Sequence, residues 1–382
     1  MSSLRRELAR FDPALEIGRA TTPPSSWYTD PGFFALERSR LLDTWQPIAR
    51  TDALTRPGDF VAGCTLGEPC VAVRGEDGAL RVLRNACLHH GAEVARGSGR
   101  ARRLVCPYHG WSYELDGRLA TRPRAEGLVG LEPGTAGLPE VPARECGPFV
   151  FAALGGAAPA APPIPADLEA RLRETRWHAL RHVGRRSYAL DCNWKVFVDN
   201  YLDGGYHVAP LHRGLGARLA GETYRTEVRD RWVLQTVQAA AAHEGEASDA
   251  GVDFAARVGS GALYAFVHPH FMLNRYGPFL DTNHVIPLAV DRTLVVFDDF
   301  VDGAAPEIAG PEGAEFVRRS LAASEAVQRE DEAICESVQR SLASRAFDRG
   351  RYAPAVENGL YAFHLWWAAD LAAGASAGGP TS

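Results

Sequence analysis

Short apolar runs alternate with turn-forming residues from about residue 45 to residue 153. Three of these runs are Phe60-Val61-Ala62, Cys70-Val71-Ala72-Val73 and Leu80-Arg81-Val82-Leu83, and Gly, Asp and Pro residues separate them. Runs of this length between turn residues are typical of antiparallel strands. The pattern therefore predicts a small antiparallel β domain over 45–153. Residues 155–165, rich in Ala, Gly and Pro, have the composition of a linker.

The pattern changes beyond this linker, where strand-like runs are mixed with helical spacing. Residues 188–190, 232–237 and 294–297 are predicted strands, whereas the apolar residues between Gly313 and Phe347 recur at helical intervals. We therefore predict an α+β second domain over 154–371. Residues 1–44, which prolines interrupt, are expected to form a helical and irregular lead-in that packs on this domain. The Ala-, Gly- and Ser-rich residues 372–382 are expected to be a disordered tail.

Composition excludes several classes of protein. Hydrophobic residues make up 46% of the 382 residues and charged residues 23%, and no apolar run approaches the roughly 20 residues that span a bilayer. The net charge is −6, and the arginines are scattered among acids, so neither a membrane span nor a nucleic-acid surface is expected. The N-terminus has no apolar signal core, which favours a cytoplasmic location. The seven cysteines lack the spacing of a disulfide scaffold, and metal ligation is the better expectation.

Two cysteines and two histidines form a regular pattern in the first domain. One residue lies between Cys87 and His89, and two residues lie between Cys106 and His109. Sixteen residues separate the first pair from the second. Two short loops therefore each offer one thiolate and one imidazole. This mixed set suits a Rieske [2Fe–2S] centre, in which two cysteines hold one iron and two histidines hold the other.

Three other interpretations of this pattern are weaker. Structural zinc sites usually pair C-x2–4-C with H-x3–5-H, and do not place one Cys and one His in each half. Unrelated buried cysteines and surface histidines would not explain four correctly spaced members. A cysteine nucleophile with a histidine partner leaves the doubled pattern unexplained. The run Cys106-Pro107-Tyr108-His109-Gly110-Trp111 also resembles the Rieske proteins, whose second loop commonly has the sequence C-P-x-H-G-W.

A second group of candidate metal ligands lies in the second domain. His207 and His212 follow a predicted helix that Gly204-Gly205 should end, and irregular backbone lets histidines five residues apart converge on one metal. Asp331 is spaced at helical intervals from Val327, Ile334, Val338 and Leu342, which places it on the same predicted buried stripe. A lone carboxylate there is costly unless it is paired or binds metal.

Two histidines and one carboxylate form the facial triad of non-haem Fe(II) oxygenases. Each residue alone could be unremarkable, since a histidine on an apolar face is usually a hydrogen-bonded core residue. Asp331, between Glu330 and Glu332, could also belong to a solvated acidic run. Together, behind a cluster that needs an acceptor for its electrons, they favour a mononuclear iron site.

The segments 193–212 and 328–339 resemble the α subunits of Rieske oxygenases. The similarity is closest to choline monooxygenases and their bacterial relatives that act on quaternary ammonium compounds, which share the sequence N-W-K-x-F-x-D-N-Y-L-D-G-G-Y-H. Residues 271–278 and 281–283 are similar too, and the resemblance covers about 45–365. It implies a Rieske domain, a helix-grip (START/Bet v1-like) catalytic domain, and a homotrimer in which the cluster of one subunit faces the iron of its neighbour.

The resemblance also implies the flow of electrons. NAD(P)H or ferredoxin would supply them through a separate reductase, and His109 would pass an electron through a bridging carboxylate to His207 of the next subunit, where the iron activates O2. Many family members have the bridging acid three residues before the first histidine ligand. Here Asp203 lies four before it and is the candidate, with Asp199 as the alternative.

The implied reaction is the monooxygenation of a small quaternary ammonium compound such as choline, which would give betaine aldehyde. Aromatic faces bind such cations through cation–π attraction. The candidate aromatic residues are Tyr201, Tyr206, Tyr264, Tyr276, Trp366 and Trp367. Two alternatives remain: the α subunit of an aromatic-ring-hydroxylating dioxygenase, and a Rieske electron-transfer or sensor protein, against which the predicted iron ligands argue.

Overall fold

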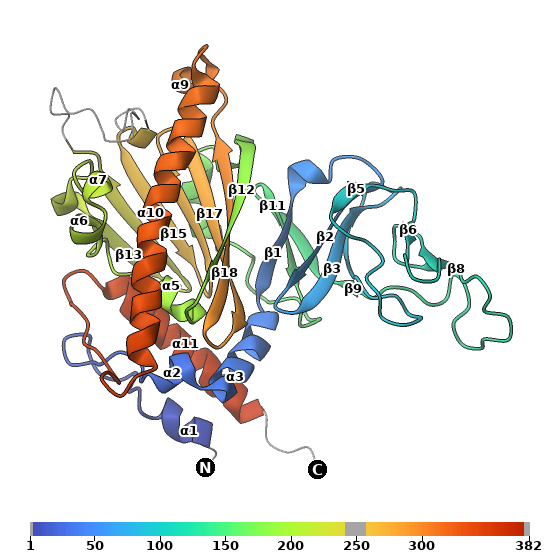
Figure 1. Ribbon diagram of the computed structural model, residues 1–382, viewed down its shortest axis with the longest axis horizontal. Helices are drawn as coiled ribbons and strands as arrows, with labels where there is room; N and C mark the ends of the chain where they lie inside the picture. The colour runs from blue at the N-terminus through green and yellow to red at the C-terminus, as the bar shows by residue number, and fades with distance from the viewer. Residues whose placement is uncertain (1–2, 241–256, 378–382) are drawn as a thin grey trace. The chain divides into compact units, whose positions relative to one another are not determined.

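The computed structural model describes residues 3–240 and 257–377, and the chain forms two units (Figure 1), each with its own hydrophobic clusters. The small unit is Leu41–Ala166, and the large unit combines Met1–Arg40 with Asp167–Ser382. The fold class is α+β, as the sequence predicts, and the strands are antiparallel in both units.

The small unit consists of three antiparallel sheets and little helix. The predicted strand runs at 60–62, 70–73 and 80–83 lie within β2, β3 and β4. The sheets, in strand order, are β1 (Trp45–Arg50), β11 (Phe149–Ala153) and β10 (Ala143–Cys146); β5 (Ser98–Arg100), β2 (Asp59–Thr65), β3 (Glu68–Arg74), β4 (Leu80–Arg84) and β9 (Glu140–Val141); and β6 (Leu104–Val105), β7 (Ser112–Tyr113) and β8 (Leu119–Thr121). A short 3-10 helix, η1 (Thr51–Ala53), follows β1.

The large unit is a seven-stranded antiparallel sheet with a long helix against it. The strand order is β12 (Arg181–Leu190), β18 (Arg292–Val301), β17 (Phe279–Ala289), β16 (Phe271–Tyr276), β15 (Gly261–Val267), β14 (Trp232–Gln238) and β13 (Arg225–Arg229). The longest helix, α10 (Gly313–Leu342), contacts both β12 and α5 (Trp194–Tyr201). A sheet that holds one long helix is the predicted helix-grip arrangement (Figure 1).

Shorter helices surround this framework. They are α1 (Ser3–Leu8), α2 (Ser26–Thr29), α3 (Pro31–Leu42), α4 (Ala166–Glu174), η2 (Trp177–Ala179), α6 (Val208–Leu211), α7 (Arg213–Gly216), η3 (Gly221–Thr223), α9 (Pro306–Ala309) and α11 (Asn358–Ala377). In the part of the chain that the structure describes, no helix combines the length and the apolar character needed to cross a membrane.

The face that α10 buries differs from the predicted stripe. Ile334 and Val338 are about 40% exposed, whereas Cys335 and Gln339 are buried. The polar Gln339 can face inward because its side-chain oxygen accepts a hydrogen bond from the backbone N–H of Asn193 (3.0 Å), and a buried polar group with a partner carries little penalty. The helix also ends at residue 342, not at the predicted 347.

The C-terminal segment also differs from its prediction. Helix α11 continues to Ala377, so residues 372–377 of the predicted disordered tail are helical. Alanine has the highest helix propensity of the amino acids, and this stretch is rich in it. The remaining predicted tail, 378–382, lies outside the described residues.

Candidate metal centres and active site

The two predicted cluster loops fold in the same way, although the spacing of their ligands differs. The Gly91 N–H donates to the Cys87 carbonyl (2.8 Å), and the Gly110 N–H donates to the Cys106 carbonyl (3.1 Å). Both glycines have φ of +74°, a left-handed conformation that glycine adopts without steric cost. Each loop is therefore a tight turn that brings its cysteine and its histidine to one corner.

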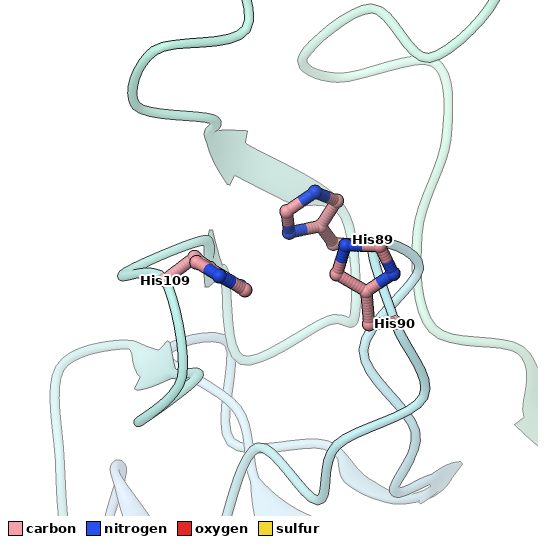
Figure 2. A group of neighbouring side chains, drawn as sticks. All are labelled: His89, His90 and His109. Atoms are coloured by element: carbon pink, nitrogen blue, oxygen red, sulfur yellow. The ribbon is translucent and has the colours of Figure 1, made fainter.

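Burial divides the four predicted cluster ligands into two pairs. Cys87 and Cys106 are 3% and 2% exposed and belong to the core of the small unit, whereas His89 and His109 are exposed. The two imidazole rings lie 4.6 Å apart between centroids, and Figure 2 shows them on the two facing loops. A Rieske cluster needs two thiolates on one iron and two imidazoles on the other. An inner thiol pair and an outer imidazole pair fit that requirement.

A third histidine, His90, lies in the same group and was missed by the sequence reasoning. Its ring centroid is 3.9 Å from that of His89 and 5.6 Å from that of His109, and the three offer ligand nitrogens within 4.8 Å of one another (Figure 2). The adjacent pair His89-His90 was the available signal. His89 stacks on Trp111 (4.8 Å between centroids, 1° between planes), which orients the predicted ligand.

Tyr113 supports the sulfur side of the predicted cluster. Its hydroxyl accepts the Leu88 N–H (2.9 Å) and lies 3.2 Å from Cys87 Sγ. Burial and this contact with Cys87 raise the pKa of Tyr113, so the hydroxyl keeps its proton. That proton can be donated to the sulfur, and hydrogen bonds to cluster sulfurs help to set the reduction potential.

Helix α5 leads to the predicted iron ligands and is anchored at its first turn. The Asn193 side-chain oxygen caps the helix by accepting the Lys195 N–H (3.1 Å). Lys195 is fully buried and pairs with Glu37 of α3 (2.5 Å). A buried ion pair that loses one partner is strongly destabilising, so the N-terminal lead-in is part of what holds α5 in place.

The turn after α5 needs both of its glycines. Gly204 and Gly205 have φ of +73° and +76°, which strains any other residue. A Cβ on Gly204 would also clash with the Val356 carbonyl, and one on Gly205 would clash with the Tyr224 ring. The chain can therefore turn tightly here and carry His207 back towards α10.

Asp203 organises this turn and orients His207. Its Oδ1 accepts the backbone N–H groups of Gly205 (2.9 Å) and Tyr206 (3.1 Å), and its Oδ2 accepts the backbone N–H of His207 (2.9 Å). The same Oδ2 lies 2.7 Å from His207 Nδ1. Asp203 lies four residues before His207, one more than in many family members, but its carboxylate still contacts the imidazole.

His212 and Asp331 complete the group. His212 Nε2 lies 3.1 Å and His207 Nε2 lies 3.9 Å from Asp331 Oδ1, and the same oxygen accepts a hydrogen bond from Asn200 Nδ2 (2.8 Å). The other nitrogen of His212, Nδ1, lies 2.6 Å from Glu330 Oε2. Each histidine thus has Nδ1 on a carboxylate and Nε2 directed to Asp331.

This pattern suits a metal. Histidine ligands usually place their second ring nitrogen on a carboxylate, which fixes the tautomer and makes the ligand more basic. Burial alone would lower the pKa of His212, but the hydrogen bonds and charges of Asp331 and Glu330 outweigh it and raise this pKa. The structure thus brings together the three predicted iron ligands and adds Asn200 and Glu330, which sequence reasoning missed.

The alternative bridging residue, Asp199, has different partners. It accepts a hydrogen bond from the Tyr28 hydroxyl (2.8 Å) and lies 3.0 Å from His364 Nε2. The other nitrogen of His364 lies 2.7 Å from the Tyr352 hydroxyl. Asp199 is therefore part of a network between α2, α5 and α11, whereas Asp203 contacts a predicted iron ligand directly.

A cavity of about 150 Å³ adjoins the predicted iron ligands. It is lined by all three of them and by three of the six predicted substrate residues, Tyr201, Tyr264 and Tyr276. Asp281 and Gln328 also line it, are nine-tenths or more buried, and were not identified from the sequence. Both lie in segments that resemble the family, but the resemblance gave neither a role, because it is the packing of the sheet and of α10 that brings these side chains to the cavity.

The other three predicted substrate residues lie elsewhere. Tyr206 is 63% exposed and does not line the cavity. Trp367 is fully buried, where its indole N–H donates to Glu37 (3.0 Å). Trp366 packs on His268, 5.7 Å between ring centroids. Trp367 fills the core because an aromatic side chain there buries a large apolar area, and none of these three side chains lines the cavity.

Two family models match the chain, one in each of its two units. A model of the Rieske [2Fe–2S] domain matches residues 44–138, and a model of the ring hydroxylating alpha subunit (catalytic domain) matches residues 177–373. The two matches define an oxygenase with both a Rieske domain and a catalytic domain. The chain belongs to the ring hydroxylating alpha subunit family of Rieske oxygenases, which confirms the predicted resemblance.

Individual relatives agree with this family. The chloroplastic choline monooxygenase of Arabidopsis thaliana is 40% identical over 379 residues, which cover 95% of this chain and 86% of that protein. The carnitine monooxygenase oxygenase subunit of Escherichia coli K12 is 32% identical over 220 residues, 56% of this chain and 59% of that one. A crystal structure of the quaternary ammonium Rieske monooxygenase CntA with an inhibitor has a TM-score of 0.81 at 25% identity, covering 95% of this chain and 97% of that one.

The protein is therefore a Rieske-type oxygenase, whose family carries a [2Fe–2S] cluster and a mononuclear iron and uses O2 with electrons from a reductase. The two donor sets fit these groups. Thiols are buried beside exposed imidazoles in the small unit, and in the large unit the imidazoles of His207 and His212 converge on the Asp331 carboxylate.

Proposed function

We propose that the chain is the oxygenase component of a monooxygenase that hydroxylates a small quaternary ammonium compound, with choline, which would give betaine aldehyde, as the first candidate. The cavity is the observation that carries this proposal. Tyr201, Tyr264 and Tyr276 line it beside the predicted iron ligands, and aromatic faces bind quaternary ammonium groups. The 40% identity to a choline monooxygenase over 95% of this chain supports the same substrate class.

Gln328 favours a substrate that carries an oxygen atom. Its Nε2 is buried and has no hydrogen-bond partner among the described residues, and the side chain lines the cavity one turn before Asp331 on α10. An unpaired buried donor costs about 1–3 kcal/mol. The hydroxyl of choline could accept this hydrogen bond and would then lie at the end of the cavity where the predicted iron ligands are.

The alternative functions are less well supported. An arene-hydroxylating dioxygenase needs a wide apolar pocket, whereas this cavity is about 150 Å³, compared with about 300–1,000 Å³ for typical ligand pockets. An electron-transfer or sensor protein has no use for His207, His212 and Asp331 converging beside a cavity.

The roles of the individual residues follow from this function. Cys87, His89, Cys106 and His109 would hold the cluster, and His207, His212 and Asp331 would hold the mononuclear iron, which supplies O2 activation when bound. Asp203 and Glu330 keep the Nδ1 atoms of the two histidines engaged, so that Nε2 faces the metal. Asp203 is our candidate for the bridge between subunits. The homotrimer and the cytoplasmic location stay predictions.

Substrate-dependent O2 uptake tests the proposed function. The purified chain, loaded anaerobically with iron and supplied with a reductase, is given choline, glycine betaine or naphthalene. We expect O2 uptake with a quaternary ammonium compound and one hydroxylated product per O2, identified by mass spectrometry, with water as the other product. A cis-diol from naphthalene would support the dioxygenase instead. A cluster that is reduced and reoxidised without any substrate oxidation would support the electron-transfer class.

A further inference from the structure

Asp281 is a buried carboxylate that faces the cavity. It lies on β17, directly opposite Asn274 of β16 and Asp299 of β18 in the strand register. Its side chain is 4% exposed and lines the cavity. Oδ1 accepts a hydrogen bond from Asn274 Nδ2 (2.6 Å), and Oδ2 accepts one from the Tyr276 hydroxyl (2.6 Å). The carboxylate is therefore held in one orientation from two sides.

Its neighbour Asp299 has a cation, but Asp281 does not. Arg186 of β12 donates two hydrogen bonds to the Asp299 carboxylate (2.7 and 3.0 Å). Within residues 3–240 and 257–377, no Lys, Arg or His forms an ion pair with Asp281. Buried charges are normally paired or bound to a ligand. Arg257 also lines the cavity, where its guanidinium lies over the Tyr276 ring, but it forms no ion pair with Asp281 among the described residues. The Asp281 carboxylate therefore presents its charge to the cavity without a directly paired cation.

The aromatic rings around Asp281 complete a site for a cation. Tyr201 donates from its hydroxyl to Asn274 Oδ1 (2.8 Å), and its ring is perpendicular to that of Tyr264 (6.5 Å, 86°). Tyr276 already holds a cation over its ring, because the Arg257 guanidinium lies 5.1 Å from the ring centroid. The cavity wall thus combines one fixed carboxylate with aromatic faces that attract positive charge.

We propose that Asp281 is the residue that makes this cavity select a cationic substrate over a neutral one of the same shape. Its carboxylate attracts the charge of the ammonium group, while Tyr201 and Tyr264 contact the methyl groups. This inference rests on the proposed function, namely that the substrate is a quaternary ammonium compound, and it names the group that recognises the charge. The matching neutral shape is 3,3-dimethyl-1-butanol, in which carbon replaces the nitrogen of choline.

The selection should depend on pH. Burial and the nearby Asp299 raise the pKa of Asp281 to about 6, although the hydrogen bonds from Tyr276 and Asn274 and the charge of Arg186 lower it. Tyr276, Tyr264 and Tyr201 keep raised pKa values and stay neutral, and Arg257 remains charged. Below about pH 6 the Asp281 carboxyl gains a proton, so affinity for a cation should fall there.

Calorimetric titration of the iron-loaded protein with tetramethylammonium chloride tests the proposal without requiring turnover. We expect Asp281→Asn to weaken binding at least about tenfold at about pH 8, and to remove the loss of affinity between about pH 8 and about pH 5.5. Binding of 3,3-dimethyl-1-butanol should be unchanged. Asp298→Asn is the matched control: Asp298 is a buried acid on β18 paired with Arg185, does not line the cavity, and should not alter tetramethylammonium binding.

Tyr276→Phe is the second variant, in case the loss of the Asp281 charge disturbs folding. It removes one hydrogen bond from the carboxylate and should shift the fall in affinity to higher pH. Equal tetramethylammonium affinity in wild type and Asp281→Asn, with both folded, would overturn the role of Asp281 while leaving choline oxidation intact. If the wild type binds tetramethylammonium through Asp281 but does not oxidise choline, only the proposed choline substrate is wrong.

Discussion

The two predicted metal sites of this chain are built in opposite ways. The four predicted cluster ligands lie within residues 87–109, on turns held by glycine, and two of them are exposed. The predicted iron ligands come from distant parts of the sequence, since Asp331 lies 119 positions after His212, and they meet only because α10 packs against α5. One site depends on local turns, and the other depends on the whole large unit.

Their surroundings differ just as clearly. Both histidines of the iron site contact a carboxylate through Nδ1, whereas in the described part of the chain neither His89 nor His109 forms an ion pair with an acid. Carboxylate partners make imidazole more basic and strengthen metal binding. Neutral surroundings instead keep the potential of a Rieske cluster high. The difference indicates that one site is arranged to hold a reactive metal and the other to accept and release electrons.

Removing one ligand from each site should give the largest and most separable effects. Asp331→Ala should reduce the iron content from about three to about two per chain and abolish turnover, while the visible spectrum of the cluster remains. Cys106→Ser should remove the cluster and leave about one iron. Iron analysis and absorption spectroscopy measure both. Loss of all iron in either variant would mean that the two sites do not form independently.

Asp203 should be essential for turnover without being essential for either metal. With Fe(II) in excess, we expect Asp203→Asn to retain about three irons per chain and to lose at least about 100-fold in turnover, because the proposed bridge to His207 loses its charged carboxylate. Asp199→Asn is the matched comparison, since Asp199 contacts His364 and Tyr28. An active Asp203→Asn beside an inactive Asp199→Asn would transfer the bridging role to Asp199.

The same contrast explains what could be predicted from sequence. The cluster ligands could be identified because one or two residues separate each pair, and so short a segment determines its own turn. The helix that carries Asp331 was also predicted, but only part of its inward face was, because Leu342 is buried and Val327 lines the cavity as expected, whereas two other members of the stripe are exposed. Ile334 and Val338 are exposed while Gln339 is buried, because a hydrogen bond with Asn193 satisfies the amide.

Side chains that reach a site from distant elements could not be predicted in this way. Glu330 adjoins His212, and Asp281 faces the cavity, only after the sheet and α10 pack together. The aromatic candidates illustrate the same limit. Trp367 was a candidate only because it is aromatic, and residue type alone does not say whether the side chain meets Glu37 in the core or lines the cavity.

Glu330 should tune the affinity of the iron site. Glu330→Gln keeps the shape of the side chain but removes the charge beside His212 Nδ1 (2.6 Å). Loss of such a partner typically weakens metal binding about 10–100-fold, so we expect faster loss of the mononuclear iron to a chelator and recovery of turnover when Fe(II) is added in excess. Glu332→Gln is the control, because Glu332 pairs with Arg329. Unchanged iron affinity in Glu330→Gln would show that this carboxylate does not support His212.

Substitution of Tyr113 should have the smallest effect, and it should change only the reduction potential of the predicted cluster. Tyr113→Phe removes the hydroxyl that lies 3.2 Å from Cys87 Sγ while keeping the ring in the core. A hydrogen bond to a cluster sulfur stabilises the reduced form, which carries more negative charge, so its loss should lower the reduction potential by an amount on the order of tens of millivolts. Redox titration of the visible spectrum measures this shift, and the content of both metals should not change. A potential equal to that of the wild type would mean that the Tyr113 proton is not directed at the sulfur, and that burial alone sets the environment of Cys87.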